Sequence, residues 1–151
     1  MTRLTQRLAM VVILTAAVAC SRESATSDVT VSITSPAEGD TVTGSAVHIM
    51  LNATGIEIAP AADARPETAH HHLYLDVDFP QLENAIPMGV AGVVHLGQAQ
   101  KDYHWEGVSP GAHRIIAVLA DPGHMPLRPW VTDTVNFVVV APPPADTTAR
   151  K

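Results

Sequence analysis

Apolar and polar residues alternate along much of this chain with a period of two, the repeat of a β-strand that has one buried face. Val29, Val31 and Ile33 alternate with threonine and serine, and the same pattern returns further along the chain. It predicts strands over residues 29–34, 47–52, 70–77, 92–96, 102–105 and 135–139. Residues 112–119 are almost continuously apolar, which is typical of a central strand buried on both sides.

No segment between these strands has a credible helical pattern. The stretch 90–98 looks most helical, but glycines interrupt it. Seven short strands with turn residues between them, within about 110 residues, predict an all-β fold: an antiparallel immunoglobulin-like β-sandwich. Two connections, 55–69 and 78–89, are too long for tight hairpins, and functional residues tend to lie on such loops.

The first nineteen residues have the pattern of an export signal. Arg3 and Arg7 precede an apolar run from Leu8 to Cys20. A run of this length, at about 1.5 Å per residue, gives roughly 20 Å of helix, which is shorter than the ~30 Å hydrocarbon core of a bilayer. A basic start, a short apolar run and small residues before a polar break indicate a signal peptide and not a membrane span.

The only cysteine, Cys20, stands where the apolar run ends, and this arrangement resembles the lipobox of bacterial lipoproteins. The resemblance implies that Cys20 is lipidated and anchors the mature chain to the membrane, although Ala17 stands where most lipoboxes carry leucine. Ser21 implies sorting to the outer membrane, on the periplasmic side of the cell envelope. The alternative is an ordinary signal peptide with a chance cysteine nearby. The expected divisions are a signal peptide (1–19), a tether (20–28), a β-sandwich domain (29–140) and a Pro-rich flexible tail (141–151).

Charge and composition exclude several classes of function. Beyond the leader the chain carries 7 basic and 15 acidic residues, so it has no basic face with which to neutralise the phosphates of a nucleic acid. Aromatic residues are only 4%, which argues against a stacking platform for bases or sugars. One cysteine excludes a disulfide framework and any multi-cysteine zinc site. A Gly-x-Ser-x-Gly motif is absent, and we expect no enzymatic activity.

Histidine, at eight, is the unusual count, and three of the eight are consecutive. Alternation places His70 and His72 on one face of their predicted strand, about 6.6 Å apart along the backbone, and the histidine between them on the other. Two such rings can meet on one ion at bonds of about 2.0–2.1 Å for zinc. His95 and His124 are the expected further metal ligands, and Asp121 is expected to orient one imidazole as a hydrogen-bond acceptor.

Copper is expected ahead of zinc, because Met88 and Met125 lie close in sequence to these histidines and thioethers favour copper(I). The alternative is that the histidines only brace loops through backbone carbonyls. His48 and His104 fall in predicted strands without nearby ligand types, and we expect them to be surface or core residues. His113 follows a Pro-Gly turn and is expected to be structural.

Four spaced motifs, taken in order, resemble the bacterial domain-of-unknown-function family 4399. The motifs are His70–Asp76, His95–Gln98, Pro110–His113 and Asp121–Pro126, and segments 35–42 and 55–60 are similar to the family as well. The resemblance spans about residues 29–140 and implies exported or lipid-anchored proteins with a β-sandwich and no established activity. The family's recurrent histidines match His70, His71, His72, His95, His113 and His124.

This chain departs from the family pattern at four positions. Val93, Pro122 and Leu127 stand where members often carry histidine, and Leu96 stands where phenylalanine is usual. These departures imply either a weakened metal site or histidines whose role is structural.

Two functions therefore remain open. The first is a periplasmic, membrane-anchored lipoprotein that binds copper or zinc through its histidines. The second is a non-catalytic accessory or binding subunit of a larger cell-envelope complex, in which the histidines are structural and Trp105 and Trp130 are candidate contact residues.

Overall fold

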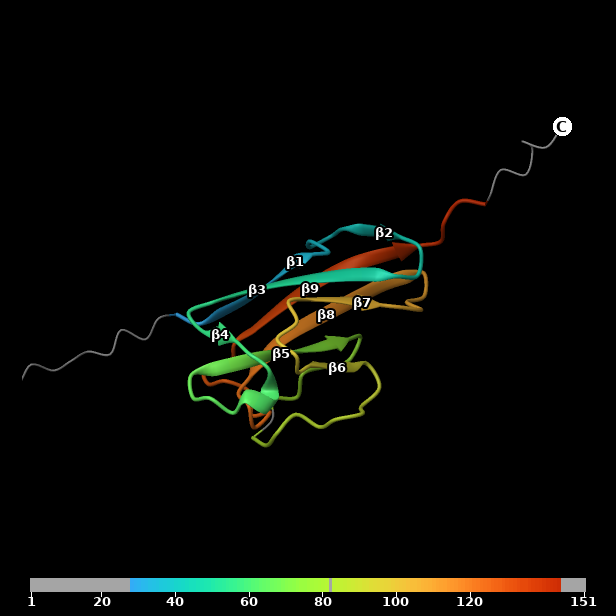
Figure 1. The fold of residues 1–151 in the computed structure, drawn as a ribbon. Helices are drawn as coiled ribbons and strands as arrows, with labels where there is room; N and C mark the ends of the chain where they lie inside the picture. The colour runs from blue at the N-terminus through green and yellow to red at the C-terminus, as the bar shows by residue number, and fades with distance from the viewer. Residues whose placement is uncertain (1–27, 82, 145–151) are drawn as a thin grey trace, which may run out of the picture.

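The computed structural model describes residues 28–81 and 83–144 as a β-sandwich with no α-helix among them. Figure 1 shows the strands packed in layers, with the first and last described residues at opposite ends. The elements are β1 (Thr30–Ser35), β2 (Thr41–Thr43), β3 (Val47–Thr54), β4 (Glu57–Ile58), a 3₁₀ turn η1 (Ala61–Asp63), β5 (Thr68–Leu75), β6 (Val93–Leu96), β7 (Asp102–Trp105), β8 (Gly111–Ala120) and β9 (Thr132–Val140).

Two sheets form the sandwich. The smaller sheet has the order β1-β3-β7, and the larger has the order β2-β9-β8-β5-β4, with β6 also paired to β5. The predicted all-β, immunoglobulin-like sandwich is confirmed. The pattern did not predict β2 and β4, which pair in parallel with β9 and β5, because strands of two or three residues are too short to show a period.

The hydrophobic core lies between the sheets and is built by alternate residues of the long strands. Val47 and Ile49 of β3 face Leu73 of β5 and Ile115 of β8, and all four are fully buried. Burial of one such side chain stabilises a fold by about 1.5–3 kcal/mol. The segment 112–119, predicted as a central strand, is β8, which pairs with β5 on one side and β9 on the other.

β5 differs in its limits from the strand predicted over 70–77. It begins at Thr68 and ends at Leu75, because Asp76 takes a left-handed backbone conformation with φ 57°. The predicted continuation of this strand to Val77 was therefore wrong. Val77 instead packs beside Tyr74, on the opposite side of the sheet from the core between the two layers.

A second, smaller hydrophobic cluster covers the outer face of the six-stranded sheet. Tyr74 of β5 and Val118 of β8 contribute from the sheet, while Phe79 and Ile86 come from the connection after β5. This connection returns over the sheet that it has just left and covers the outer face of β5, while the core between the sheets covers the other face. All residues of β5 except the last are buried.

No helix in the described part of the chain is long and apolar enough to cross a membrane. The predicted signal peptide, the lipidation site Cys20, most of the tether and most of the tail lie outside the described residues.

Candidate metal centre

The alternation of β5 divides its three histidines between the two faces of the sheet, as the sequence predicted. His70 and His72 lie opposite Ala120 and Val118 of β8, whose side chains belong to the outer-face cluster. His71 points the other way, towards the core, and its Nδ1 donates a 3.1 Å hydrogen bond to the carbonyl of Gln100. All three side chains are fully buried.

The third imidazole comes from β6, where His95 lies directly opposite His72. Leu75 donates its backbone N–H to Gly92 in the same antiparallel ladder, at 2.8 Å. Hydrogen-bonded and non-hydrogen-bonded pairs alternate along such a ladder, so His72 and His95 form a non-hydrogen-bonded pair, the kind whose side chains lie closer together. The two ring centroids are 5.0 Å apart.

The fourth imidazole comes from the loop after β8, which lies beside the beginning of β5 (Figure 1). Asp121 holds this loop in shape, since its carboxylate accepts a 2.9 Å hydrogen bond from the backbone N–H of Met125. The carbonyl of Asp121 accepts a second hydrogen bond, from the N–H of His124, at 2.8 Å. His124 has φ 65°, and its ring lies with its centroid 5.0 Å from that of His70 and 4.7 Å from that of His95.

We refer to His70, His72, His95 and His124 as the four-histidine cluster. One ring nitrogen from each lies within 4.8 Å of the corresponding atom of every other member, and the Nε2 atoms of His70 and His72 are 3.0 Å apart. Two nitrogens bonded to one ion at about 2.0–2.1 Å and at tetrahedral angles are roughly 3.3 Å apart. The cluster is therefore close to the dimensions of a metal site before any ion is added.

Burial lowers the pKa of three of these rings, which favours their neutral form. Loss of hydration lowers the pKa of His70 to about 4 and that of His72 to about 3, and the neighbouring imidazoles lower both further because like charges repel. Burial also lowers the pKa of His95. A neutral imidazole has one lone pair in the plane of its ring, which is the form that binds a metal ion.

Several ring nitrogens in the cluster lack a hydrogen-bond partner among the described residues. These are Nδ1 of His70, Nδ1 of His72 and Nε2 of His95, all of them buried. A buried polar atom left without a partner costs about 1–3 kcal/mol. The cluster carries several such atoms on one small patch of sheet, which is unusual for histidines that serve only to brace loops.

Gly97 provides the space in which the His95 ring lies. A Cβ atom built on Gly97, the residue that follows β6, would overlap the Cε1 and Nε2 atoms of that ring. Sequence reasoning did not identify Gly97 as a site residue. The signal was present as a glycine two positions after a histidine in a predicted strand.

The loop residues expected near the ion have other contacts. Asp121 forms hydrogen bonds with the backbone of its own loop, at Met125 and His124. Asp121 thus positions His124 through the loop. Met88 is 60% exposed, in contrast to the fully buried His70 and His72.

His113 stands apart from the cluster and has a partner on each ring nitrogen. Its Nδ1 donates to the carboxylate of Asp76 and its Nε2 donates to the carbonyl of Ser109, both at 2.7 Å. Burial lowers the pKa of His113, but the hydrogen bonds to Asp76 and Ser109 outweigh this effect and leave the pKa raised. Both nitrogens are donors, so the ring has no free lone pair for a metal or for base catalysis.

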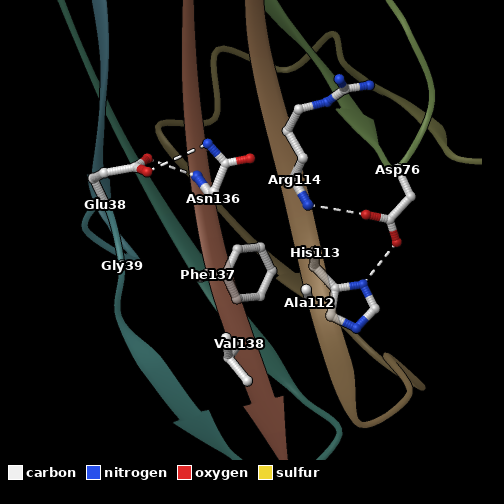
Figure 2. A pocket seen from close by; sticks show the side chains of 9 residues that line it. All are labelled: Glu38, Gly39, Asp76, Ala112, His113, Arg114, Asn136, Phe137 and Val138. Carbon is white, nitrogen blue, oxygen red and sulfur yellow. Dashed lines mark hydrogen bonds and ion pairs between the residues drawn. The ribbon is translucent and has the colours of Figure 1, made fainter.

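A shallow hollow of about 550 Å³ lies next to His113. Figure 2 shows Asp76 bridging the ring of His113 and the backbone N–H of Arg114, while Glu38 is hydrogen-bonded to Asn136 on the other side. The carboxylates of Asp76 and Glu38 are thus held by hydrogen bonds within the fold, and the Arg114 guanidinium donates to Asp78.

His48 and His104 were expected to lie without ligand types near them, and that expectation was wrong. They face each other across β3 and β7, with Asp102 two residues from His104 on the same face. All three are exposed, as a surface assignment predicts. We refer to these three residues as the open histidine site.

The comparisons with known proteins give a family and several structural likenesses. No curated protein matches the chain. The chain is similar to an engineered protein (13% identity, 77% of this chain and 21% of that one, TM-score 0.47). It is also similar to fibronectin(III)-like modules of Clostridium thermocellum CbhA (18%, 75% and 99%, TM-score 0.46) and to the PKD domain of human KIAA0319 (13%, 80% and 88%, TM-score 0.39).

The present chain spans about a fifth of the length of the engineered protein. The family model described as "Domain of unknown function (DUF4399)" matches residues 49–140, which include every strand from β4 to β9 and the whole four-histidine cluster. The chain therefore belongs to the DUF4399 family.

Proposed function

We propose that this protein binds one transition-metal ion through the four-histidine cluster. The observation that carries the proposal is the convergence of four imidazoles from three chain segments, one nitrogen of each within 4.8 Å of the others. Two of the rings are fully buried. Three buried ring nitrogens of the cluster lack a hydrogen-bond partner among the described residues, whereas a single cation can accept one lone pair from each of four imidazoles.

The donor set favours copper(II), with zinc as the second choice. Imidazole nitrogens suit both ions, and a site of given nitrogen donors binds copper(II) more tightly than the other divalent ions of the first transition row. The cluster contains neither a thiolate nor a carboxylate. The sequence argument for copper(I) depended on two methionines, and the exposure of Met88 weakens it.

The proposed setting is the periplasmic side of the cell envelope, with the domain held to the membrane by a lipid on Cys20. This part of the proposal rests on the sequence alone. Two or three acyl chains would make the attachment stable, since each buried CH₂ group contributes about 0.8 kcal/mol. A tethered domain of this kind could also dock on a larger envelope complex.

The decisive experiment compares two variants of neighbouring residues in β5. Tag-free apoprotein is titrated with Cu²⁺ and Zn²⁺ by calorimetry, and one equivalent of high-affinity binding is expected. His72→Gln should weaken that binding at least about 100-fold, because it removes one of four ligands. His71→Gln removes an equally buried histidine from the same strand but from its other face, and it should leave the affinity within about threefold of the unaltered protein.

Circular dichroism and thermal unfolding of the two apo variants show whether each is folded. If the apoprotein takes up no ion at micromolar concentrations, or if both variants lose uptake equally, the histidines are structural. A stoichiometric protein partner that survives chelation in solubilised membranes would then support the accessory-subunit hypothesis.

A further inference from the structure

The open histidine site lies on the outer face of the three-stranded sheet, away from the four-histidine cluster. His48 of β3 and His104 of β7 are directly opposite in an antiparallel ladder. Leu51 donates its N–H to Lys101 in that ladder, at 2.8 Å, so the alternation of pairs again makes the two histidines a non-hydrogen-bonded pair. Their rings are stacked, with centroids 4.1 Å apart and planes within 4° of parallel.

Asp102 adds a carboxylate to this pair. It projects from the same face of β7 as His104, and its Oδ2 is 3.3 Å from Nε2 of His48. One nitrogen from each ring and one carboxylate oxygen lie within 4.8 Å of one another. The side chains of His48 and Asp102 are 44% and 59% exposed, so water has access to the remaining coordination positions.

An ion pair between His48 and Asp102 accounts for only part of this arrangement. That ion pair does not involve His104, whose ring is stacked on the ring of His48. Two imidazoles and one carboxylate on one face, with open positions for water, form a donor set that takes divalent transition-metal ions.

We propose that His48, Asp102 and His104 form a second site, open to solvent, for a divalent transition-metal ion, with Cu²⁺ bound most tightly. The parallel rings must turn about their χ2 bonds for their lone pairs to converge on one ion, which their exposure permits. The site has three protein ligands in place of four and is not enclosed. Binding is therefore expected to be at least about tenfold weaker than in the four-histidine cluster, and faster to exchange.

This proposal does not depend on the proposed function, because the two sites lie on different sheets. The test uses tag-free mature protein that carries His70→Gln and His72→Gln, so that the cluster is removed. Calorimetric titration with Cu²⁺ is expected to show one remaining equivalent, and the electron paramagnetic resonance spectrum of the bound ion should show nitrogen coupling. Adding His104→Gln should weaken this binding at least tenfold, and Asp102→Asn should weaken it less.

Asn52→Ala is the matched control, because Asn52 is exposed on the same face of β3. It should leave Cu²⁺ binding unchanged. If the variant without the cluster does not fold, the same comparison is made in the unaltered protein, where His104→Gln should remove the weaker of two Cu²⁺ equivalents and keep the stronger. Binding that is absent, or that is unaffected by both His104→Gln and Asp102→Asn, overturns the proposal.

Discussion

The two sheets carry the same local feature, a cross-strand pair of histidines, in two different settings. His72 lies opposite His95 on the larger sheet, and His48 lies opposite His104 on the smaller one. Both are non-hydrogen-bonded pairs, the kind whose side chains lie closer together, and their ring centroids are 5.0 Å and 4.1 Å apart. The pairs differ in what surrounds them, and this difference decides what each can do.

On the larger sheet, the imidazoles of His70 and His124 join the pair, and the connection after β5 covers this face of the sheet. On the smaller sheet, the pair has only the carboxylate of Asp102 beside it and is exposed to solvent. Covering the rings lowers their pKa values and removes competing water, so each lone pair becomes a better ligand at neutral pH. The pairing of strands brings the histidines together, and the burial of their rings by the rest of the fold determines their affinity for an ion.

The largest expected effect is on thermal stability. An ion that binds only the folded chain at 100 times its dissociation constant stabilises it by about 2.7 kcal/mol. For a domain of this size that corresponds to a rise in Tm of about 10 °C or more. Differential scanning calorimetry with one equivalent of Cu²⁺ measures it, and His72→Gln should abolish the rise. A rise that His72→Gln leaves intact would assign the stabilisation to the open histidine site.

The next largest effect is on the Cu²⁺ affinity of the four-histidine cluster when a ligand is displaced but not replaced. Gly97→Ala keeps all four imidazoles but pushes the His95 ring out of the space that it occupies. We expect Cu²⁺ affinity of the cluster to fall about 10- to 100-fold, as for loss of a group that orients a ligand. Calorimetric titration measures the affinity. Binding to the open histidine site is the internal control and should not change, and an unaltered cluster affinity would show that the ring has another place to lie.

A pH effect distinguishes the buried rings in the apoprotein. Burial holds the pKa of His70 at about 4 and that of His72 at about 3, below their ordinary value of 6.5. Between these values and 6.5 the unfolded chain binds more protons than the folded chain, so the free energy of unfolding decreases as pH falls through this window. Urea unfolding at pH 7.5, 6, 5 and 4 measures the decrease.

The same series on the apo variant with His70→Gln and His72→Gln should give a flatter dependence on pH. Equal slopes for the two proteins would mean that other groups cause the loss of stability.

The smallest effect has the opposite sign and concerns His113. Its pKa is raised in the folded state, so its contribution to stability is complete below about 6.5 and is lost as pH rises through the raised value. The contribution should be less than about 1 kcal/mol, because the carboxylate of Asp76 is 46% exposed. A proton NMR titration of the His113 ring measures the pKa, and Asp76→Asn should lower it. An unchanged value would remove Asp76 as the cause.

Much of the fold could be predicted from the alternation of apolar and polar residues, because the long strands bury every second side chain. The same alternation predicted that His70 and His72 share a face and that His71 does not. The sequence could suggest that His95 converges on this pair but could not establish it, since the convergence depends on which strand pairs with β5 and in which register.

Other features of the fold and of the sites depend on tertiary contacts that cannot be predicted from the local sequence pattern. The open histidine site arises from the pairing of β3 with β7, which brings together residues more than fifty positions apart. The end of β5 at Asp76 depends on a left-handed residue, and that residue sends Val77 to the covered face. The sequence places Gly97 two positions after His95, but the overlap between them depends on where the His95 ring lies.

The alternation of β5 has a consequence for how this protein can diverge. A single residue inserted within the strand would exchange its two faces, bringing the leucines under the cover and the ring donors into the core. Homologous chains can therefore change the ligands only by replacement, one position at a time. Position 93, where this chain has valine, is on the same face as His95, so a histidine gained there would add a donor without disturbing the hydrophobic interior.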